Sequence, residues 1–389
     1  MLSSGDRGTL DLLNQTKSRR FFSRQLFEKP MQANSHQRVQ TYCGRACIFK
    51  SSDAMENLQL PSSVSNGKSI RDWTFYNQAQ TTERAVVQKL LHSLCAGLEE
   101  PTQERGRPRY PLADMVFCAA FKVYTGLSGR RFMGSLEEAR THGYIEKMPH
   151  YNSIFNCLEN ASLTPHLHEL IKQSSLPLKA VEQDFAADSS GFTTGERMLW
   201  RKAKYGTSEL WGDWVKAHVF CGLKTQIIVS VELSERYEHD SKFFEPLLEK
   251  AIESGFRPRE ISLDKAYLSR KTYELIDRCG ATGYIDFKSN SRGDTQSEVW
   301  NRMHHFFSYN KADFYQHYYK RENIESLFSA LKRKLGERLK SKNPMAQRNE
   351  LLLKFLCHNL IVLAEAIVEF ELETTFWAED QSVQLELPF

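Results

Sequence analysis

Apolar residues recur at three-and-four spacing from about residue 72 to residue 175, and this spacing predicts helices. The clearest runs are Val86, Val87, Leu90, Leu91 and Leu94, followed by Leu112, Met115, Val116, Ala119 and Val123. A shorter helix is expected over Tyr151–Ala161, after Pro149. We therefore predict an all-helical domain over residues 71–178. Arginines between its helices would suit DNA binding or dimerisation, although solvated basic loops are the commoner use of such residues.

After Leu178 the pattern changes to short β-rich runs alternating with helices. The first two runs form a hairpin around a tight turn at residues 223–225. The expected elements are strands Val215–Gly222 and Gln226–Leu233, helix Ser241–Ser254, a strand at Ile261–Leu263, helix Lys271–Cys279, strand Ala281–Phe287 and a long helix Tyr318–Leu335. A meander followed by alternating strands and helices predicts a mixed α/β sheet flanked by helices over residues 179–370.

Composition fits a folded globular protein, with 41% hydrophobic, 26% charged and 12% aromatic residues. These values exclude collagen-like, largely disordered and disulfide-dense chains. A formal net charge of +4 identifies no partner. Residues 1–50 nevertheless hold nine Lys/Arg against three acids, so we interpret residues 1–70 as a loosely ordered basic arm with a linker. A solvated tail that only aids solubility is the alternative.

Neither end of the chain suggests a membrane. The start has no basic region followed by an apolar run, so no secretory signal is expected. The most apolar stretch, Leu351–Phe370, contains Lys354 and Glu365, which favour a buried amphipathic helix.

Three acids are candidates for chemistry. Asp188 is expected where an apolar strand meets a turn, Asp264 directly follows a strand, and Glu325 lies inside the long helix. Carboxylates at the carboxyl edge of an α/β sheet are plausible metal ligands. A single Asp at a strand end is more often a turn or cap residue, so the helix carries the argument.

At 100° per residue, Tyr318, Arg321, Glu325 and Lys332 fall within an arc of about 60° beside the apolar stripe of that helix. An Arg321–Glu325 surface ion pair would explain only half of this row.

The spacing Tyr318-x2-Arg321-x3-Glu325-x6-Lys332 resembles the Tyr-Arg-Glu-Lys signature of the DDE transposases of bacterial insertion sequences. Asp188-Ser-Ser-Gly-Phe is similar to the first-aspartate segment of that family. Asp264-Lys-Ala-Tyr is similar to the second, with Ala266 in place of the commoner glycine. The resemblance covers about residues 105–370.

The resemblance implies a ribonuclease-H-like catalytic domain in which Asp188, Asp264 and Glu325 are catalytic and hold two Mg2+ ions, with Mn2+ as a substitute. Oxygen ligands and hard divalent cations suit each other and suit in-line phosphoryl transfer. Tyr318, Arg321 and Lys332 would bind DNA. The implied activity is cleavage at the terminal inverted repeats of the element and strand transfer to target DNA, in a cytoplasmic, nucleoid-associated bacterial protein.

Local charge agrees with a DNA partner. Residues 320–348 contain nine basic residues against three acids: Lys320, Arg321, Lys332, Arg333, Lys334, Arg338, Lys340, Lys342 and Arg348. The 61 positions from Asp264 to Glu325 are too few for a large inserted domain. We expect a strand, a linker and the start of the long helix there, with Trp300 in the core.

Residues 371–389 form an acidic tail, expected to be flexible, that ends in Gln384-Leu385-Glu386-Leu387-Pro388-Phe389. This ending resembles the peptide with which bacterial proteins dock on the replication sliding clamp, through Gln384, Leu385, Leu387 and Phe389. A tail with stray leucines is the alternative. Joining two DNA ends in concert favours a homodimer.

Two other function classes remain open. A catalytically silent DNA-binding relative would keep the fold without cutting, and a metal-dependent nuclease would cut without joining. Inverted repeats beside the gene would discriminate, because only a transposase needs cognate ends.

Overall fold

A computed structural model describes residues 73–103, 106, 108–194, 214–370, 372 and 374–377. The predicted basic arm and linker over residues 1–70 lie outside this part of the chain. So do the tail peptide Gln384–Phe389 and residues 195–213. The described residues all belong to one compact unit.

Helices come first, as the apolar spacing predicts. They are α1 (Trp73–Cys95), α2 (Leu112–Thr125), α3 (Gly129–Thr141), α4 (Tyr151–Leu158) and α5 (Leu163–Ser175), followed by the 3-10 turn η1 (Leu176–Leu178). α2 ends where Gly126 adopts φ 64°, a left-handed conformation that glycine reaches without a Cβ penalty. Residues 115–123 of α2 are buried, because α2 packs against α1, α4 and the C-terminal helix.

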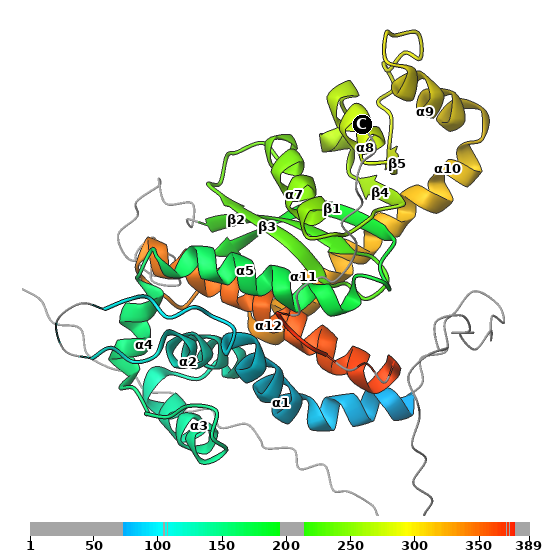
Figure 1. The fold of residues 1–389 in the computed structure, drawn as a ribbon. Coiled ribbons are helices and arrows are strands. Elements are labelled where there is room, and N and C mark those ends of the chain that lie inside the picture. Colours follow the sequence, from blue (N-terminus) through cyan, green and yellow to red (C-terminus); the bar gives the residue numbers. More distant parts are fainter. Residues whose placement is uncertain are drawn as a thin grey trace, which may run out of the picture. The chain divides into compact units, whose positions relative to one another are not determined.

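A five-stranded mixed sheet follows, in the order β3-β2-β1-β4-β5. Its strands are β1 (Asp184–Thr193), β2 (Trp214–Gly222), β3 (Ile228–Ser234), β4 (Glu260–Leu263) and β5 (Thr282–Ile285). β1, β2 and β3 form an antiparallel meander, whereas β4 and β5 run parallel to β1. The predicted hairpin and the predicted mixed sheet flanked by helices are both present (Figure 1).

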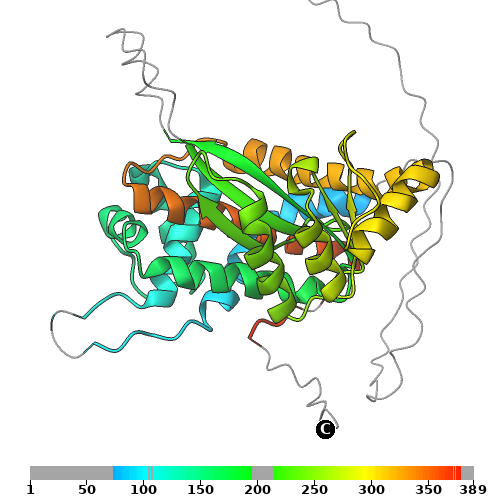
Figure 2. The ribbon, with the colours of Figure 1, turned by 90° about the horizontal axis from the view of Figure 1, so that it is seen from above.

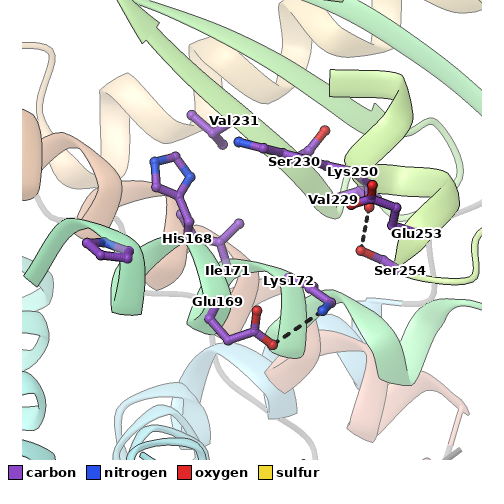
Figure 3. Close-up of a pocket in the computed structure, with 11 residues that line it drawn as sticks. His168, Glu169, Ile171, Lys172, Val229, Ser230, Val231, Lys250, Glu253 and Ser254 are labelled. Carbon is purple, nitrogen blue, oxygen red and sulfur yellow. Dashed lines mark hydrogen bonds and ion pairs between the residues drawn. The ribbon is translucent and has the colours of Figure 1, made fainter. Parts of the chain in front are cut away.

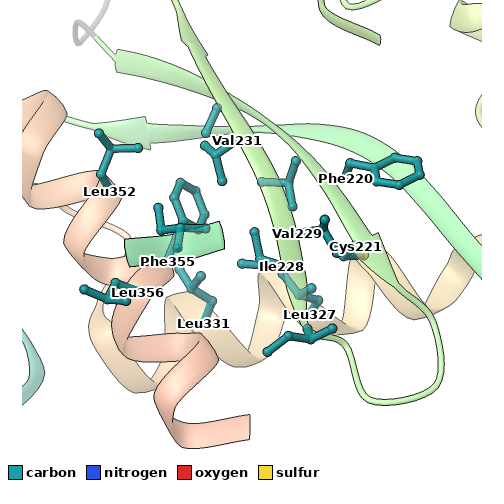
Figure 4. Close-up of a cluster of buried hydrophobic side chains, with 14 of the residues drawn as sticks. Phe220, Cys221, Ile228, Val229, Val231, Leu327, Leu331, Leu352, Phe355 and Leu356 are labelled. Carbon is teal, nitrogen blue, oxygen red and sulfur yellow. The ribbon is translucent and has the colours of Figure 1, made fainter. Parts of the chain in front are cut away.

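Helices cover both faces of the sheet (Figure 2). α7 (Ser241–Glu253) packs on β2 and β3, and α8 (Arg270–Arg278) packs on β5. The hydroxyl of Ser230 in β3 donates to the Leu247 carbonyl of α7 at 2.7 Å. The neighbours Val229 and Val231 point to the other face, since side chains alternate along a strand. There they join the apolar cluster of α11 (Glu322–Leu335) and α12 (Pro344–Phe370), shown in Figure 4.

α12 connects the sheet to the first helices. It contacts α1, α2, α4, α5 and β3. Its fully buried Asn359 imitates a neighbouring strand at the edge of β3: the amide oxygen accepts from the Ile228 N–H at 2.9 Å, and the amide nitrogen donates to the Ile228 carbonyl at 2.7 Å. By length and composition α12 could cross a membrane, but 78% of its apolar window is buried inside the protein, as in a core helix.

Two sequence predictions about residues 265–335 are wrong. The long helix expected over Tyr318–Leu335 is three pieces: α10 (Lys311–Tyr318), the 3-10 turn η3 (Tyr319–Arg321) and α11. Ser262 in β4 donates its hydroxyl to the His317 carbonyl at 3.0 Å, and the helix tightens directly after this intrusion. The expected linker is helical as well, because α9 (Glu298–Tyr309) and α10 occupy it.

The prediction that no large domain separates Asp264 from Glu325 agrees with the structure, in which every residue of this stretch is described. Trp300 of α9 is buried, as predicted, and packs edge-on against Tyr273 and Phe287.

Candidate active site

Asp188 lies inside β1, not at its end as the sequence suggests. β1 continues to Thr193 because its antiparallel pairing with β2 extends that far, whereas its parallel pairing with β4 ends at Ala187 and Leu263. Asp188 therefore comes directly after the parallel part of the strand, and Asp264 directly follows β4. Both carboxylates lie where β1 and β4 separate.

The three predicted acids converge on one guanidinium. Nη1 of Arg321 lies 3.9 Å from Oδ2 of Asp188, and Nη2 lies 3.9 Å from Oδ1 of Asp264. The same Nη2 lies 3.1 Å from Oε1 of Glu325. β1, the β4–η2 junction and α11 thus bring together residues that are 76 and 61 positions apart in sequence.

Arg321 is in turn held by Tyr318. The guanidinium carbon lies 5.7 Å from the centre of the Tyr318 ring, and the two side chains are hydrogen-bonded. Tyr318 is buried at the end of α10, so its ring is a fixed wall beside the carboxylates.

Lys332 is not part of this constellation. It lies two turns along α11 from Glu325, with Nζ 3.3 Å from Oε1 of Glu337 and 5.3 Å from the centre of the Phe192 ring. The structure therefore groups Tyr318, Arg321 and Glu325 of the sequence signature and leaves Lys332 at the far end of β1.

A second ionic cluster, which was not predicted from the sequence, lies four residues earlier on the same two strands. Asp184 of β1 and Glu260 of β4 are direct cross-strand partners. Two like charges in this position repel each other. Nζ of Lys320 bridges them, at 2.8 Å from Asp184 and 2.7 Å from Glu260. His317 and Arg259 complete the cluster, at 2.8 Å from Glu260 and 3.0 Å from Asp184.

This cluster fixes the backbone that carries Arg321, because Lys320 is the preceding residue of η3. We call Asp184, Glu260, Lys320, His317 and Arg259 the anchoring cluster. Its sequence signal was weak but present: each anchoring acid precedes a site aspartate by four positions, which places both on the same face of the chain.

The two clusters have opposite electrostatics. Burial raises the pKa of Asp188 to about 6, although the Ser189 amide and Arg321 oppose this rise. Burial also acts on Asp184 and Glu260, but their hydrogen bonds and ion pairs together outweigh it and hold both pKa values below the ordinary range. Lys320 bonds both acids, Arg259 bonds Asp184, and His317 bonds Glu260. The anchoring acids are thus well paired, whereas Asp188 is short of positive charge.

Asp240 is a further acid behind the site, and its negative charge contributes to the raised pKa of Asp188. It precedes α7, and its Oδ1 forms an ion pair with Nζ of Lys216 in β2 at 2.5 Å. The buried ring of His218 lies beside it, with Nδ1 3.4 Å from the same carboxylate oxygen.

The chemistry of the donors fits divalent cations, since three carboxylates from three elements supply the hard oxygen ligands that Mg2+ prefers. Their geometry is not that of a ready metal site: among the described residues, no group of three or more His, Cys, Asp or Glu is spaced to hold a metal ion. Between the carboxylates lies the guanidinium of Arg321, which supplies the positive charge at that point.

Some of the basic residues in the run 320–348 bind other groups of the protein itself. Lys320 belongs to the anchoring cluster, Lys334 pairs with the buried Glu83 of α1, and Lys340 donates to the Gly126 carbonyl. The local excess of positive charge therefore overstates the surface available to DNA.

An apolar recess of the sheet lies away from these residues. A cavity of about 360 Å3 lies between α5, β3 and α7, and Figure 3 shows His168, Lys172, Val231 and Ser254 around it. Lys172 and Glu169 form an ion pair at the rim of this cavity, with Nζ 3.4 Å from Oε1. None of the site acids lines this cavity.

Comparison with known families identifies a match to part of the chain. Residues 179–360 match the family model described as "Transposase DDE domain", which spans the sheet, α7 to α11 and most of α12. The resemblance identified from the sequence is confirmed over this segment. No curated protein matches the chain significantly.

Proposed function

Because residues 179–360 belong to the transposase DDE family, we propose that this protein is an insertion-sequence transposase that cuts DNA at the terminal inverted repeats of its element and joins the cut ends to target DNA. One observation carries the proposal: Asp188, Asp264 and Glu325, from three separate elements, meet at a single positively charged group. Carboxylates that only stabilised the fold would be paired as closely as those of the anchoring cluster.

In this proposal Asp188, Asp264 and Glu325 hold two Mg2+ ions. Ions held there would supply the charge that activates the attacking oxygen and stabilises the leaving oxygen of the scissile phosphate. Burial keeps Asp188 in a poorly hydrated position, where charge interactions are strong. Tyr318 orients Arg321 next to the carboxylates, and the guanidinium supplies positive charge for a DNA phosphate. Lys332 would bind the backbone further along, beyond the end of β1.

The other partners are proposals of the same kind. The helical region of residues 71–178 would bind DNA or dimerise, so that two element ends are held together. The tail residues Gln384, Leu385, Leu387 and Phe389 would dock on the sliding clamp.

The test is nicking of a labelled duplex that carries the repeats flanking the gene. Wild type and Glu325→Gln are compared with Mg2+, with Mn2+ and with EDTA. The proposal expects cutting at the repeat boundary by wild type only, and only with a divalent ion. Supplying a target duplex should then give joined products.

Each of the other outcomes supports a different function. Cutting that never leads to joining, or that ignores the repeats, supports a nuclease. Binding of the repeats without cutting under either metal supports a catalytically silent relative. Equal cutting by Glu325→Gln removes Glu325 from the site.

A further inference from the structure

Arg321 occupies the point on which the three carboxylates converge. We infer that Arg321 and the divalent cations compete for these carboxylates, so that metal ions enter only as the guanidinium leaves, and that the released guanidinium then binds a DNA phosphate. This inference rests on the proposed function, because it assigns the metal ions to Asp188, Asp264 and Glu325.

Charge balance supports competition. One guanidinium faces three carboxylates, and only Glu325 is within hydrogen-bond distance, at 3.1 Å. Asp188 and Asp264 are both at 3.9 Å, which is an ion-pair distance without a hydrogen bond. Arg321 therefore neutralises the group only in part, and a doubly charged ion would neutralise it better.

Geometry supports competition as well. The described residues contain no three acids close enough together to hold a metal ion. Each of the three carboxylates has an oxygen within 3.9 Å of a guanidinium nitrogen, so Arg321 takes the contacts that a metal ion would need. If Arg321 left, the three carboxylates would repel one another, and an incoming cation would remove that repulsion.

The side chain of Arg321 can move without the backbone. Lys320 ties η3 to Asp184 and Glu260 at 2.8 and 2.7 Å, so the main chain is fixed. The side chain of Arg321 is only 20% exposed, less than that of any of the three carboxylates, whereas the side chain of Glu325 is 59% exposed. The guanidinium therefore reaches solvent by turning past Glu325. Outward movement brings it to the surface from which DNA would approach the carboxylates.

The test measures Mn2+ affinity of the full chain without DNA, by electron paramagnetic resonance of free Mn2+. Wild type is compared with Arg321→Gln, with Arg321→Lys and with Asp188→Asn. Arg333→Gln is the matched control, because Arg333 is an exposed residue of the same helix and loses the same charge. Circular dichroism confirms that each variant is folded.

Competition predicts that Arg321→Gln binds Mn2+ more tightly than wild type by at least about tenfold, because a unit charge some 4 Å away no longer opposes the ion. Arg321→Lys keeps the charge and should remain closer to wild type than Arg321→Gln. Arg333→Gln should change the affinity less than about twofold, since salt screens a distant exposed charge. Asp188→Asn should weaken binding in either background.

An unchanged or weaker affinity in Arg321→Gln overturns the inference, because Arg321 would then organise the carboxylates rather than compete for them. If Asp188→Asn still weakens Mn2+ binding in that case, the proposed metal site survives. Mn2+ binding that ignores both Asp188 and Arg321 would overturn the metal site together with the inference.

The role of DNA is tested by reciprocity. If a phosphate captures the released guanidinium, a duplex carrying the repeats should tighten Mn2+ binding by a larger factor in wild type than in Arg321→Gln. Equal factors in the two proteins would overturn the phosphate half of the inference.

Discussion

Asp184 and Asp188 lie four residues apart on one face of β1, yet they have opposite roles in the electrostatics of the protein. Asp184, with its cross-strand partner Glu260, is bridged by Lys320 at hydrogen-bond distances. Asp188, with Asp264, faces Arg321 at 3.9 Å. The first pair has a lowered pKa at both acids, and Asp188 has a pKa raised to about 6.

The difference separates stability from function. A carboxylate that is closely paired in the folded state stabilises it at neutral pH, whereas a buried carboxylate with too little positive charge destabilises it. The anchoring cluster holds β1, β4 and η3 together. We call Asp188, Asp264, Glu325 and Arg321 the site cluster. It carries three negative charges against one positive charge, as is expected of a group that is completed by a ligand.

The largest effect is expected from a substitution in the site cluster. Asp264→Asn should reduce repeat-directed cutting by at least about 1,000-fold, because a metal ligand contributes several kcal/mol to stabilising the transition state. The protein should still fold, since the ion pair of Asp264 with Arg321 is long, at 3.9 Å. Gel assays of cutting beside thermal unfolding check both statements, and a variant that loses stability and activity together would contradict the separation.

The next largest effect is expected from a substitution in the anchoring cluster. Lys320→Gln leaves Asp184 and Glu260 facing each other, and the free energy of unfolding should fall by about 2 kcal/mol, a value reduced for partial exposure. Urea unfolding at pH 7 measures it. The control is Lys271→Gln, since the pair of Lys271 with Glu245 at 2.7 Å is solvent-exposed and its loss should leave the unfolding midpoint unchanged.

A pH series sharpens the contrast at Asp188. Because its folded pKa is raised, the unfolded chain releases the proton first, so stability falls as pH rises from the ordinary pKa near 4 to about 6. Asp188→Asn removes this loss. Without metal, the variant should be more stable than wild type by about 1–2 kcal/mol at pH 7 and equal to it near pH 4. A stability difference that did not vary with pH would refute the assignment.

The smallest expected effect concerns Lys332, the signature residue outside the site cluster. Glu337→Gln removes its partner at 3.3 Å, whose side chain is 57% exposed. The free energy of unfolding should change by less than about 0.5 kcal/mol. Binding to repeat DNA should strengthen slightly at low salt, because Lys332 is released for phosphate. Fluorescence anisotropy at two salt concentrations measures this, and weaker binding would contradict it.

The elements of the fold were largely predictable because they depend on local periodicity. The hairpin β2–β3 and the helices α7 and α8 begin and end within two residues of the expected positions. The pieces α10, η3 and α11 were not predictable, because they depend on Ser262 of another strand reaching the His317 carbonyl. A periodic pattern contains no information about such a contact.

The sequence by itself determined the types and spacing of the candidate site residues: three acids in their family segments, and a Tyr-Arg-Glu-Lys row. Only the tertiary structure decided that Arg321 lies among all three acids, that Lys332 lies apart, and that Lys320 serves the fold. Charged side chains have no periodic signature of their partners. Which carboxylate a lysine or arginine meets depends on how strands and helices pack across long stretches of chain, and that packing sets both distance and burial.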